Sequence, residues 1–335
     1  MTYLAEIEES LASNLPLHPW NGVLDRHPLR LPYAEPGGPD QVLAWAGEVL
    51  QDQGLPQIGP AQQMRTWNLA ALWKIPAEGA DVWLKCVPPF FAHEGAILAR
   101  LQDGPVPRLL AHQGGKVLMK EIAGEDQYSA QLPTLLVLVS MLVHLQAKWV
   151  DHETELLALG LPDWRAAPLR ESIISVVRRT SGELLVEDRR TLDRLLDRLP
   201  QRFAALEACG VPDSLVHGDF APGNARGTSK ELVLLDWGDC GVGHPLLDRS
   251  AFMDRIAVEL VPAVKHHWDT QWRQAIAGCD PAAAAAILAP IAAARQAVIY
   301  RAFLDQTEPA EHLYHRSDPA IWLTRAAYLT RSAPQ

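Results

Sequence analysis

Two short segments place carboxylates and an amide where they could act on phosphate groups. Asp219 and Asn224 stand five residues apart in the segment His-Gly-Asp-Phe-Ala-Pro-Gly-Asn, which spans 217–224. An apolar run over 232–235 then leads into Asp236, which is followed by Trp and Gly. Phosphoryl transfer requires one carboxylate that accepts the proton of the attacking hydroxyl, and oxygen ligands that hold magnesium against the nucleotide phosphates. The spacing therefore predicts a kinase active site, with two groups on a loop and a third at the end of a strand.

These residues resemble the catalytic centre of the aminoglycoside phosphotransferase and choline kinase superfamily. Its pattern is H-G-D-x-x-x-x-N followed by a D-[WF]-G-like metal motif. The resemblance implies that Asp219 is the catalytic base and that Asn224 and Asp236 bind Mg2+. Both ligands supply oxygen, which a hard cation prefers. The alternative is that Asp219 and Asn224 only cap a turn, as Asp and Asn often do. His217 is expected to be a buried residue that hydrogen-bonds the loop, and Trp237 is expected to pack beneath the metal motif.

A kinase fold also needs a lysine on a strand, paired with a glutamate of the next helix, to hold the nucleotide phosphates. Residues 81–87 have the pattern of a strand that ends at two prolines, which makes Lys85 the candidate. The following stretch, 91–101, has apolar residues at helical spacing and carries Glu94 in its first turn. Because this pair precedes the catalytic loop, a phosphate-binding role is favoured over a solvated surface lysine.

The segment expected to cover the phosphates departs from the usual patterns. Protein kinases have Gly-x-Gly-x-x-Gly there, but residues 63–74 contain no glycine, and the chain has no G-x-x-x-x-G-K-[ST] motif. Members of the resembled superfamily often keep a polar turn with an Asn at this place, and Asn68 fits it. Phosphate contacts from Arg65, Thr66, Trp67 and Asn68 are therefore expected, with Asn68 at the place of the family's Asn. The alternative is an ordinary turn between two strands.

A further strand and a hinge are expected before the catalytic half of the chain. Residues 116–122 have the pattern of a strand that runs into Ala and Gly. The backbone of Met119, Lys120 and Ile122 would then contact the adenine. The stretch 132–150 follows as a helix that is apolar on most sides, which is typical of a core helix. It is too short and too often interrupted by polar residues and proline to cross a bilayer.

The resemblance implies an α+β, bilobal, protein-kinase-like fold, with an antiparallel sheet and helices in the N-terminal lobe and a mostly helical C-terminal lobe. The N-terminal nucleotide-binding lobe is expected over 1–122 and the catalytic, substrate-binding lobe over 123–335. Residues 2–14 have the pattern of an acidic amphipathic helix. Residues 15–39 contain six prolines and predict an extended strap on the first lobe. A capped helix is expected over 40–53.

Composition limits the classes of function. The chain has 335 residues, 48% of them hydrophobic, and a net charge of −10, with no basic stripe, so nucleic-acid binding is disfavoured. The four cysteines show no C-x-x-C spacing, and no targeting segment is visible, which favours a cytoplasmic protein that neither binds nor crosses a membrane. The sequence does not predict an oligomeric state.

The expected acceptor is a small molecule with a free hydroxyl. The stretch between Gly238 and Pro245 is too short for the activation segment of a protein kinase, so a peptide acceptor is disfavoured. The expected cofactors are ATP or GTP with Mg2+, and the expected acceptors are an aminoglycoside, an amino sugar or an amino alcohol. The alternative is a catalytically weak or inactive nucleotide-binding pseudokinase with a regulatory role. The altered phosphate loop permits this alternative, but the intact set of candidate residues argues against it.

Overall fold

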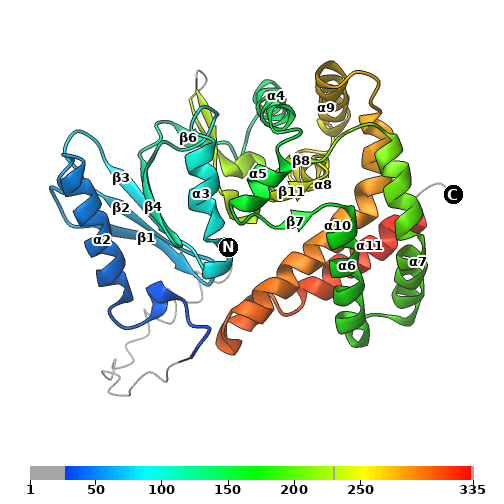
Figure 1. Cartoon of the computed structure of the whole chain (residues 1–335), viewed down its shortest axis with the longest axis horizontal. Coiled ribbons are helices and arrows are strands. Elements are labelled where there is room, and N and C mark those ends of the chain that lie inside the picture. The colour runs from blue at the N-terminus through cyan, green and yellow to red at the C-terminus, as the bar shows by residue number, and fades with distance from the viewer. Residues whose placement is uncertain (1–26, 229–230, 333–335) are drawn as a thin grey trace.

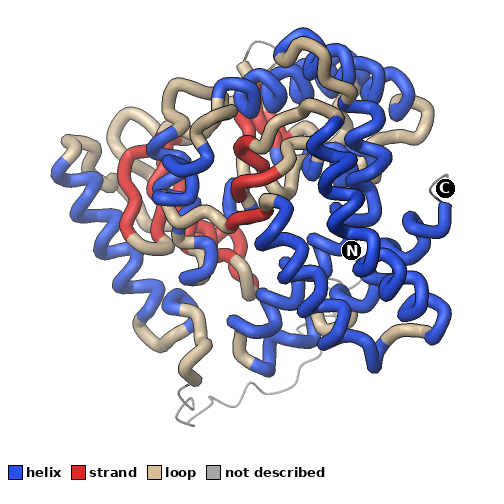
Figure 2. Tube along the Cα trace, turned by 45° about the vertical axis from the view of Figure 1, so that its right-hand side comes forward, coloured by secondary structure: helices blue, strands red, loops and turns tan. Residues whose placement is uncertain are grey.

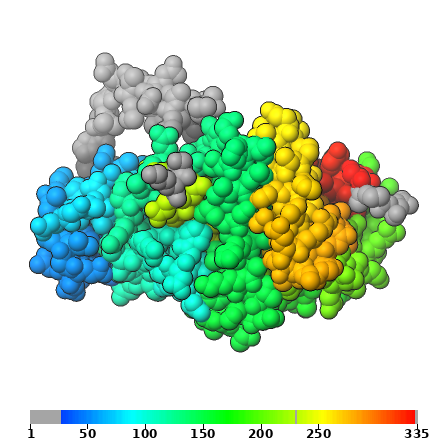
Figure 3. Space-filling model, turned by 90° about the horizontal axis from the view of Figure 1, so that it is seen from above, coloured from blue at the N-terminus to red at the C-terminus, as the bar shows by residue number. Residues whose placement is uncertain are grey.

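The computed structural model describes residues 27–228 and 231–332. A smaller lobe built around a sheet precedes a larger, mostly helical lobe (Figures 1 and 2). In the space-filling view the blue and cyan residues lie at one end of the long axis and the orange and red residues toward the other (Figure 3). The predicted bilobal α+β fold is confirmed. The helix predicted over 2–14 lies outside the described residues, as do residues 15–26 of the proline-rich segment.

The N-terminal lobe is a five-stranded antiparallel sheet in the order β1-β2-β3-β5-β4. Alternate residues of β2 and β3 are buried, because one face of the sheet packs on helix α2. The predicted lysine strand, the helix after it and the helix near residue 40 are all present. The elements are α2 (Gly38–Asp52), β1 (Gln62–Trp67), β2 (Ala70–Ile75), β3 (Val82–Cys86), α3 (His93–Arg100), β4 (Leu109–Gln113) and β5 (Lys116–Lys120).

The C-terminal lobe packs its helices around one large apolar core that also takes in residues of α3. The apolar helix expected near residues 132–150 is α4, and it is buried in this core as predicted. The helices are α4 (Leu132–Lys148), α5 (Glu153–Ala158), α6 (Ala166–Thr180), α7 (Val186–Ala208), α8 (Leu247–Met253), α9 (Val261–Ala275), α10 (Pro281–Gln306) and α11 (Asp318–Ser332).

Helix α10 is the longest helix of this lobe. Within the described part of the chain it alone has the length and composition of a membrane span, and 56% of its most apolar window is buried. It packs against α11, α6, α7 and α8, and its many alanines allow those helices to approach closely. Its apolar character is therefore accounted for by burial inside the lobe.

Two small sheets position the loops that carry the candidate catalytic residues. Strands β9 (Ala225–Gly227) and β10 (Leu232–Leu234) form an antiparallel pair, and β6 (Glu125–Asp126) joins the other side of β9. Strand β11 (Gly241–Gly243) pairs with β8 (Ser214–Val216) and β7 (Asp163–Trp164). The catalytic loop thus runs from β8 to β9, and the metal motif runs from β10 to β11. The lobe boundary after residue 122 remains a prediction, although β5 belongs to the first sheet and β6 already pairs with the C-terminal half.

Candidate active site

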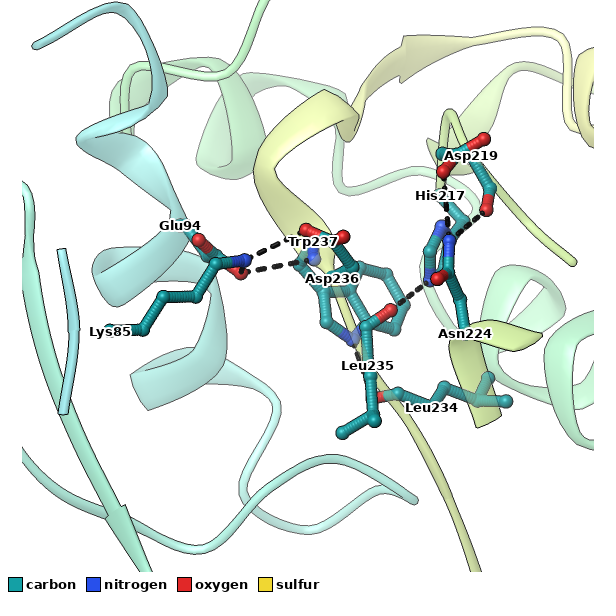
Figure 4. A network of polar contacts seen from close by, with 9 residues as sticks. All are labelled: Lys85, Glu94, His217, Asp219, Asn224, Leu234, Leu235, Asp236 and Trp237. Carbon is teal, nitrogen blue, oxygen red and sulfur yellow. Dashed lines mark hydrogen bonds and ion pairs between the residues drawn. The ribbon is translucent and has the colours of Figure 1, made fainter. Parts of the chain in front are cut away.

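Lys85 contacts its expected partner Glu94 and also Asp236, and the three form one cluster of charges (Figure 4). Its Nζ lies 2.6 Å from Glu94 Oε1 and 2.7 Å from Asp236 Oδ1. Strand β3 supplies the lysine, the first turn of α3 supplies the glutamate, and the end of β10 supplies the aspartate. Glu94 Oε1 also accepts a hydrogen bond of 3.2 Å from the backbone N–H of Trp237. The ion pairs therefore connect the sheet of the first lobe to the motif of the second.

Burial and charge act in opposite directions on these three groups. Burial would lower the pKa of Lys85, but the carboxylates of Asp236 and Glu94 outweigh it and raise that pKa above its ordinary value. The charge of Lys85 lowers the pKa of Asp236, whereas burial raises the pKa of Glu94 despite the lysine beside it. Lys85 is therefore a permanent cation at neutral pH.

Asp236 has an unusual backbone conformation. Its φ of 64° lies in the left-handed region, which residues other than glycine seldom adopt. Its side chain is 55% exposed, although the residues around it are largely buried. Such local strain is concentrated at functional sites. Here it places a carboxylate at the surface of the cleft between the lobes.

The catalytic loop holds Asp219 and Asn224 against each other. Asn224 Nδ2 donates hydrogen bonds of 2.8 Å to both the backbone O and the Oδ2 of Asp219. The backbone O of Asn224 accepts a hydrogen bond of 2.8 Å from the N–H of Leu235. Because Leu235 directly precedes Asp236, this bond holds Asn224 close to the second predicted metal ligand. The structure therefore gathers the predicted base and both predicted metal ligands. Because the side-chain N–H groups of Asn224 donate to Asp219, its Oδ1 is the atom that can bind a cation.

The carboxylate of Asp248 supports this loop from beneath. It accepts hydrogen bonds from the backbone N–H groups of His217 (2.8 Å) and Gly218 (2.7 Å) and from the Gln146 side chain (2.9 Å). Gly218 has φ of 90°, and a Cβ built on it would lie 1.9 Å from the backbone O of Asp239. Only glycine fits there, because both the conformation and the space exclude a side chain. Asp248 belongs to α8, so this helix holds the start of the catalytic loop in place.

His217 and Trp237 have the packing roles expected of them. His217 Nε2 donates to the backbone O of Leu235 at 2.9 Å, and burial lowers its pKa, so the ring is neutral. The Trp237 ring is fully buried with its centroid 4.5 Å from that of His217, and its Nε1 donates to the backbone O of Leu234 at 3.0 Å. Together the two rings form the floor under Asp236.

The cleft between the lobes has a volume of about 910 Å³. Met119, Lys120 and Ile122 all line it, as expected of a hinge. Two backbone groups of this hinge already have partners in the protein. The O of Ile122 accepts from Arg226 Nε at 3.0 Å, and the N–H of Lys120 donates to the O of Arg108 at 2.9 Å. The contact of Met119, Lys120 and Ile122 with the adenine stays a prediction, and the Ile122 carbonyl can accept a second hydrogen bond beside the one from Arg226.

The structure does not bring Asn68 to the cleft. It lies in the turn between β1 and β2, is 4% exposed, and is absent from the residues that line the cavity. Neither its Nδ2 nor its Oδ1 has a partner in the described chain. Arg65 and Trp67 line the cleft from the same hairpin. Leu72 and Lys74 of the second strand line it as well. Of the hairpin residues expected to contact phosphates, Arg65 and Trp67 are the ones that border the cavity.

Sequence reasoning missed two residues of the site. Arg255, just after α8, lies with its Nη1 2.7 Å from Asp219 Oδ1. Asp239 lines the cleft three residues after Asp236, and burial together with the neighbouring Asp219 and Asp236 raises its pKa to about 7. The spacing of Asp239 in the motif could have indicated it. No sequence signal marks Arg255, because its partner is 36 residues away.

A divalent cation fits the oxygen groups on this side of the cleft. Asn224 and Asp236 offer one amide oxygen and one carboxylate, and no cluster of three or more His, Cys, Asp or Glu metal ligands exists in the described chain. Mg2+ is usually bound by one or two carboxylates, with phosphate oxygens and water completing its shell. The residues therefore fit a cation that arrives with a nucleotide better than a resident metal held by protein ligands alone.

The two lobes, the Lys85–Glu94 pair of the first lobe, its contact with Asp236 of the second lobe and the two motif loops define a protein-kinase-like phosphotransferase fold. Residues 74–282, more than half of the chain, match the model of a family described as the phosphotransferase enzyme family. The chain belongs to this family. A search of curated protein sequences finds no significant match.

Solved structures share the fold at low sequence identity. A putative aminoglycoside phosphotransferase from Ralstonia eutropha is 17% identical, with a TM-score of 0.60 over 88% of this chain and 99% of that chain. A choline/ethanolamine kinase family protein from Mesorhizobium loti is 15% identical, with a TM-score of 0.58 over 87% and 99%. A spectinomycin phosphotransferase in complex with ADP and spectinomycin is 12% identical, with a TM-score of 0.54 over 87% and 98%.

Proposed function

We propose that this phosphotransferase moves the γ-phosphoryl group of ATP to a hydroxyl of a small molecule. The observation that carries the proposal is the convergence of Lys85, Asp219, Asn224 and Asp236 on one cleft of about 910 Å³. A structural relative with ADP bound supports the choice of an adenine nucleotide. The acceptor class that we propose is an aminoglycoside, an amino sugar or an amino alcohol. Relatives of the same fold that are named for spectinomycin and for choline or ethanolamine support it.

Each residue of the cluster has a separate task in this reaction. Lys85, oriented by Glu94, would bind the α and β phosphates once a nucleotide displaces its contact with Asp236. Asn224 and Asp236 would hold Mg2+, which neutralises the charge of the phosphates when bound. Asp219, held by Asn224, would orient the acceptor hydroxyl and take its proton as the oxygen attacks the γ phosphorus. The bond from that phosphorus to the bridging oxygen breaks, and ADP leaves.

The pseudokinase alternative predicts nucleotide binding without transfer. It draws support from the glycine-free hairpin and from the position of Asn68 away from the cleft. The geometry of the catalytic loop supports the enzyme, because the Asn224 side chain donates to the backbone O of Asp219 and the Asn224 backbone O accepts from the N–H of Leu235, the residue before Asp236. We also propose a cytoplasmic location, since all four cysteines are free and buried.

The test is ADP release with a panel of aminoglycosides, amino sugars, choline-like alcohols and other amino alcohols. We expect at least one acceptor to be phosphorylated, with the product confirmed by mass. With that acceptor, Asp219→Asn should lower turnover by roughly two to four orders of magnitude and leave ATP affinity nearly unchanged. A wild-type protein that binds ATP but phosphorylates no member of the panel would favour the pseudokinase. Near wild-type transfer by Asp219→Asn would refute the assignment of the base.

A further inference from the structure

The described part of the proline-rich segment, residues 27–37, is here called the strap. Sequence reasoning expected it to lie on the first lobe, but it also reaches the second. Arg30 Nε and Nη2 lie 3.2 and 3.1 Å from Glu308 Oε2, although the two residues are 278 positions apart. Their side chains are only 14% and 16% exposed. In Figure 1 the blue residues before α2 accordingly lie beside the orange C-terminal end of α10.

The strap also holds the hairpin that faces the cleft. The hydroxyl of Tyr33 donates a hydrogen bond of 3.3 Å to the backbone O of Trp67. Tyr33 is 4% exposed and belongs to the core of the first lobe. Burial raises its pKa, so the hydroxyl remains a donor at physiological pH. The end of β1 is therefore fixed by a buried residue of the strap as well as by its pairing with β2.

The hairpin meets the second lobe through an aromatic contact. The ring of Trp67 makes an edge contact with His315, with centroids 6.3 Å apart. The His315 ring is in turn 5.4 Å from Tyr300 and 5.8 Å from Phe303. All four rings line the cleft. Burial, followed by the charges of Asp318 and Asp219, raises the pKa of Tyr300 to about 12.

Strap, hairpin and aromatic wall thus form one connected path from the first lobe to the second. The hairpin at the centre of this path, residues 63–74, contains no glycine. Its backbone therefore has less conformational freedom to close over a ligand without support from other segments. We propose that Arg30, Tyr33 and Glu308 are positioning residues that hold the β1–β2 hairpin across the cleft, so that Trp67 stays against His315 at its edge. The proposal rests on the proposed function for its meaning in catalysis, but its structural content can be measured without an acceptor.

Hydrogen exchange followed by mass spectrometry tests this in the full-length protein. Arg30→Ala and Glu308→Ala should each speed exchange across residues 62–75 by about fivefold, the scale of a modest ion pair, and leave α4 unchanged. The charge-swapped protein with Arg30→Glu and Glu308→Arg should restore slow exchange. If the swap fails to fold, Arg30→Lys, which keeps the charge, should retain most of the protection.

The matched control is Arg179→Ala. Arg179 and Asp305 form another ion pair between distant segments, at 2.6 Å, but both belong to the second lobe. This variant should leave hairpin exchange unchanged. An unchanged hairpin in Arg30→Ala, a uniform increase over the whole chain, or an equal effect of Arg179→Ala would each overturn the proposal. Because no acceptor is present, these outcomes are independent of whether the protein transfers phosphate.

Discussion

Arg255 and Asp219 form a direct ion pair, in which Nη1 donates to Oδ1 at 2.7 Å. Asn224 holds the other carboxylate oxygen at 2.8 Å, so both oxygens of the proposed base are engaged in the free protein. A carboxylate oxygen has two lone pairs, and an acceptor hydroxyl can therefore bind Oδ1 beside the guanidinium. Arg255 is 46% exposed and lines the cleft, so it lies beside the proposed base at the cavity surface.

The first prediction is that Arg255→Gln lowers turnover by about tenfold, less than Asp219→Asn, because Asn224 still orients the carboxylate. The double variant should be no slower than Asp219→Asn alone, since Arg255 acts through that carboxylate. Initial rates of ADP release with an identified acceptor measure this. Losses that multiply in the double variant would show that Arg255 has a task of its own.

The second prediction concerns Asp236. Asp236→Ala should reduce turnover by about a thousandfold or more, because the phosphates lose a ligand that neutralises their charge. Calorimetric titration of ATP with and without Mg2+ should show a magnesium-dependent gain in affinity in the wild type that the variant lacks. The metal assignment would be wrong if the two proteins bound ATP equally well and without regard to magnesium.

The third prediction concerns the pair Lys85 and Glu94. Lys85→Ala should lower turnover by about a hundredfold, since the phosphates lose their main protein cation. Adding Glu94→Ala should cost far less than a second independent loss, because the two residues act as one unit. The control is Lys116→Ala. Lys116 lies on β5 with its Nζ 4.7 Å from the centroid of the Trp45 ring, and its loss should leave turnover unchanged. Fully additive losses at 85 and 94 would indicate two unrelated residues.

The fourth prediction is a dependence of stability on pH that originates in Asp239. Burial raises its pKa from 3.8 to about 7 in the folded protein. Between about pH 4 and 7 the unfolded chain has lost this proton and the folded chain keeps it, so this residue makes stability fall as the pH rises. Asp239→Asn removes the effect. Its melting temperature relative to wild type should therefore rise between pH 4.5 and 7.5, on the order of 2–4 °C.

Thermal unfolding followed by circular dichroism at several pH values measures this difference. Asp280→Asn is a useful comparison, because Asp280 caps α10 with an exposed side chain far along the chain from the motif loops. It should show no comparable trend over the same range. A difference for Asp239→Asn that stays constant with pH would mean that Asp239 is ionised throughout.

The proximity of several candidate site residues could be predicted from the sequence, because short segments link them. Asp219 and Asn224 are five residues apart and bond each other within one loop, so their arrangement depends on local backbone geometry. The Lys85–Glu94 pair is likewise set by a strand followed directly by a helix. The apolar patterns of β3 and α4 predicted these elements, since burial imposes the periods of strand and helix.

Tertiary structure decided the contacts between distant segments, which no spacing encodes. The Arg226 side chain donates a hydrogen bond to the backbone O of Ile122, which is 104 positions away in the sequence. Arg30 pairs with Glu308, which is 278 positions away. Asn68 has the residue type expected of a phosphate contact, but it is buried in the hairpin turn, and Arg65 and Trp67 line the cleft. Such pairings form only when the fold closes long loops, and packing then selects which side chain faces the cavity.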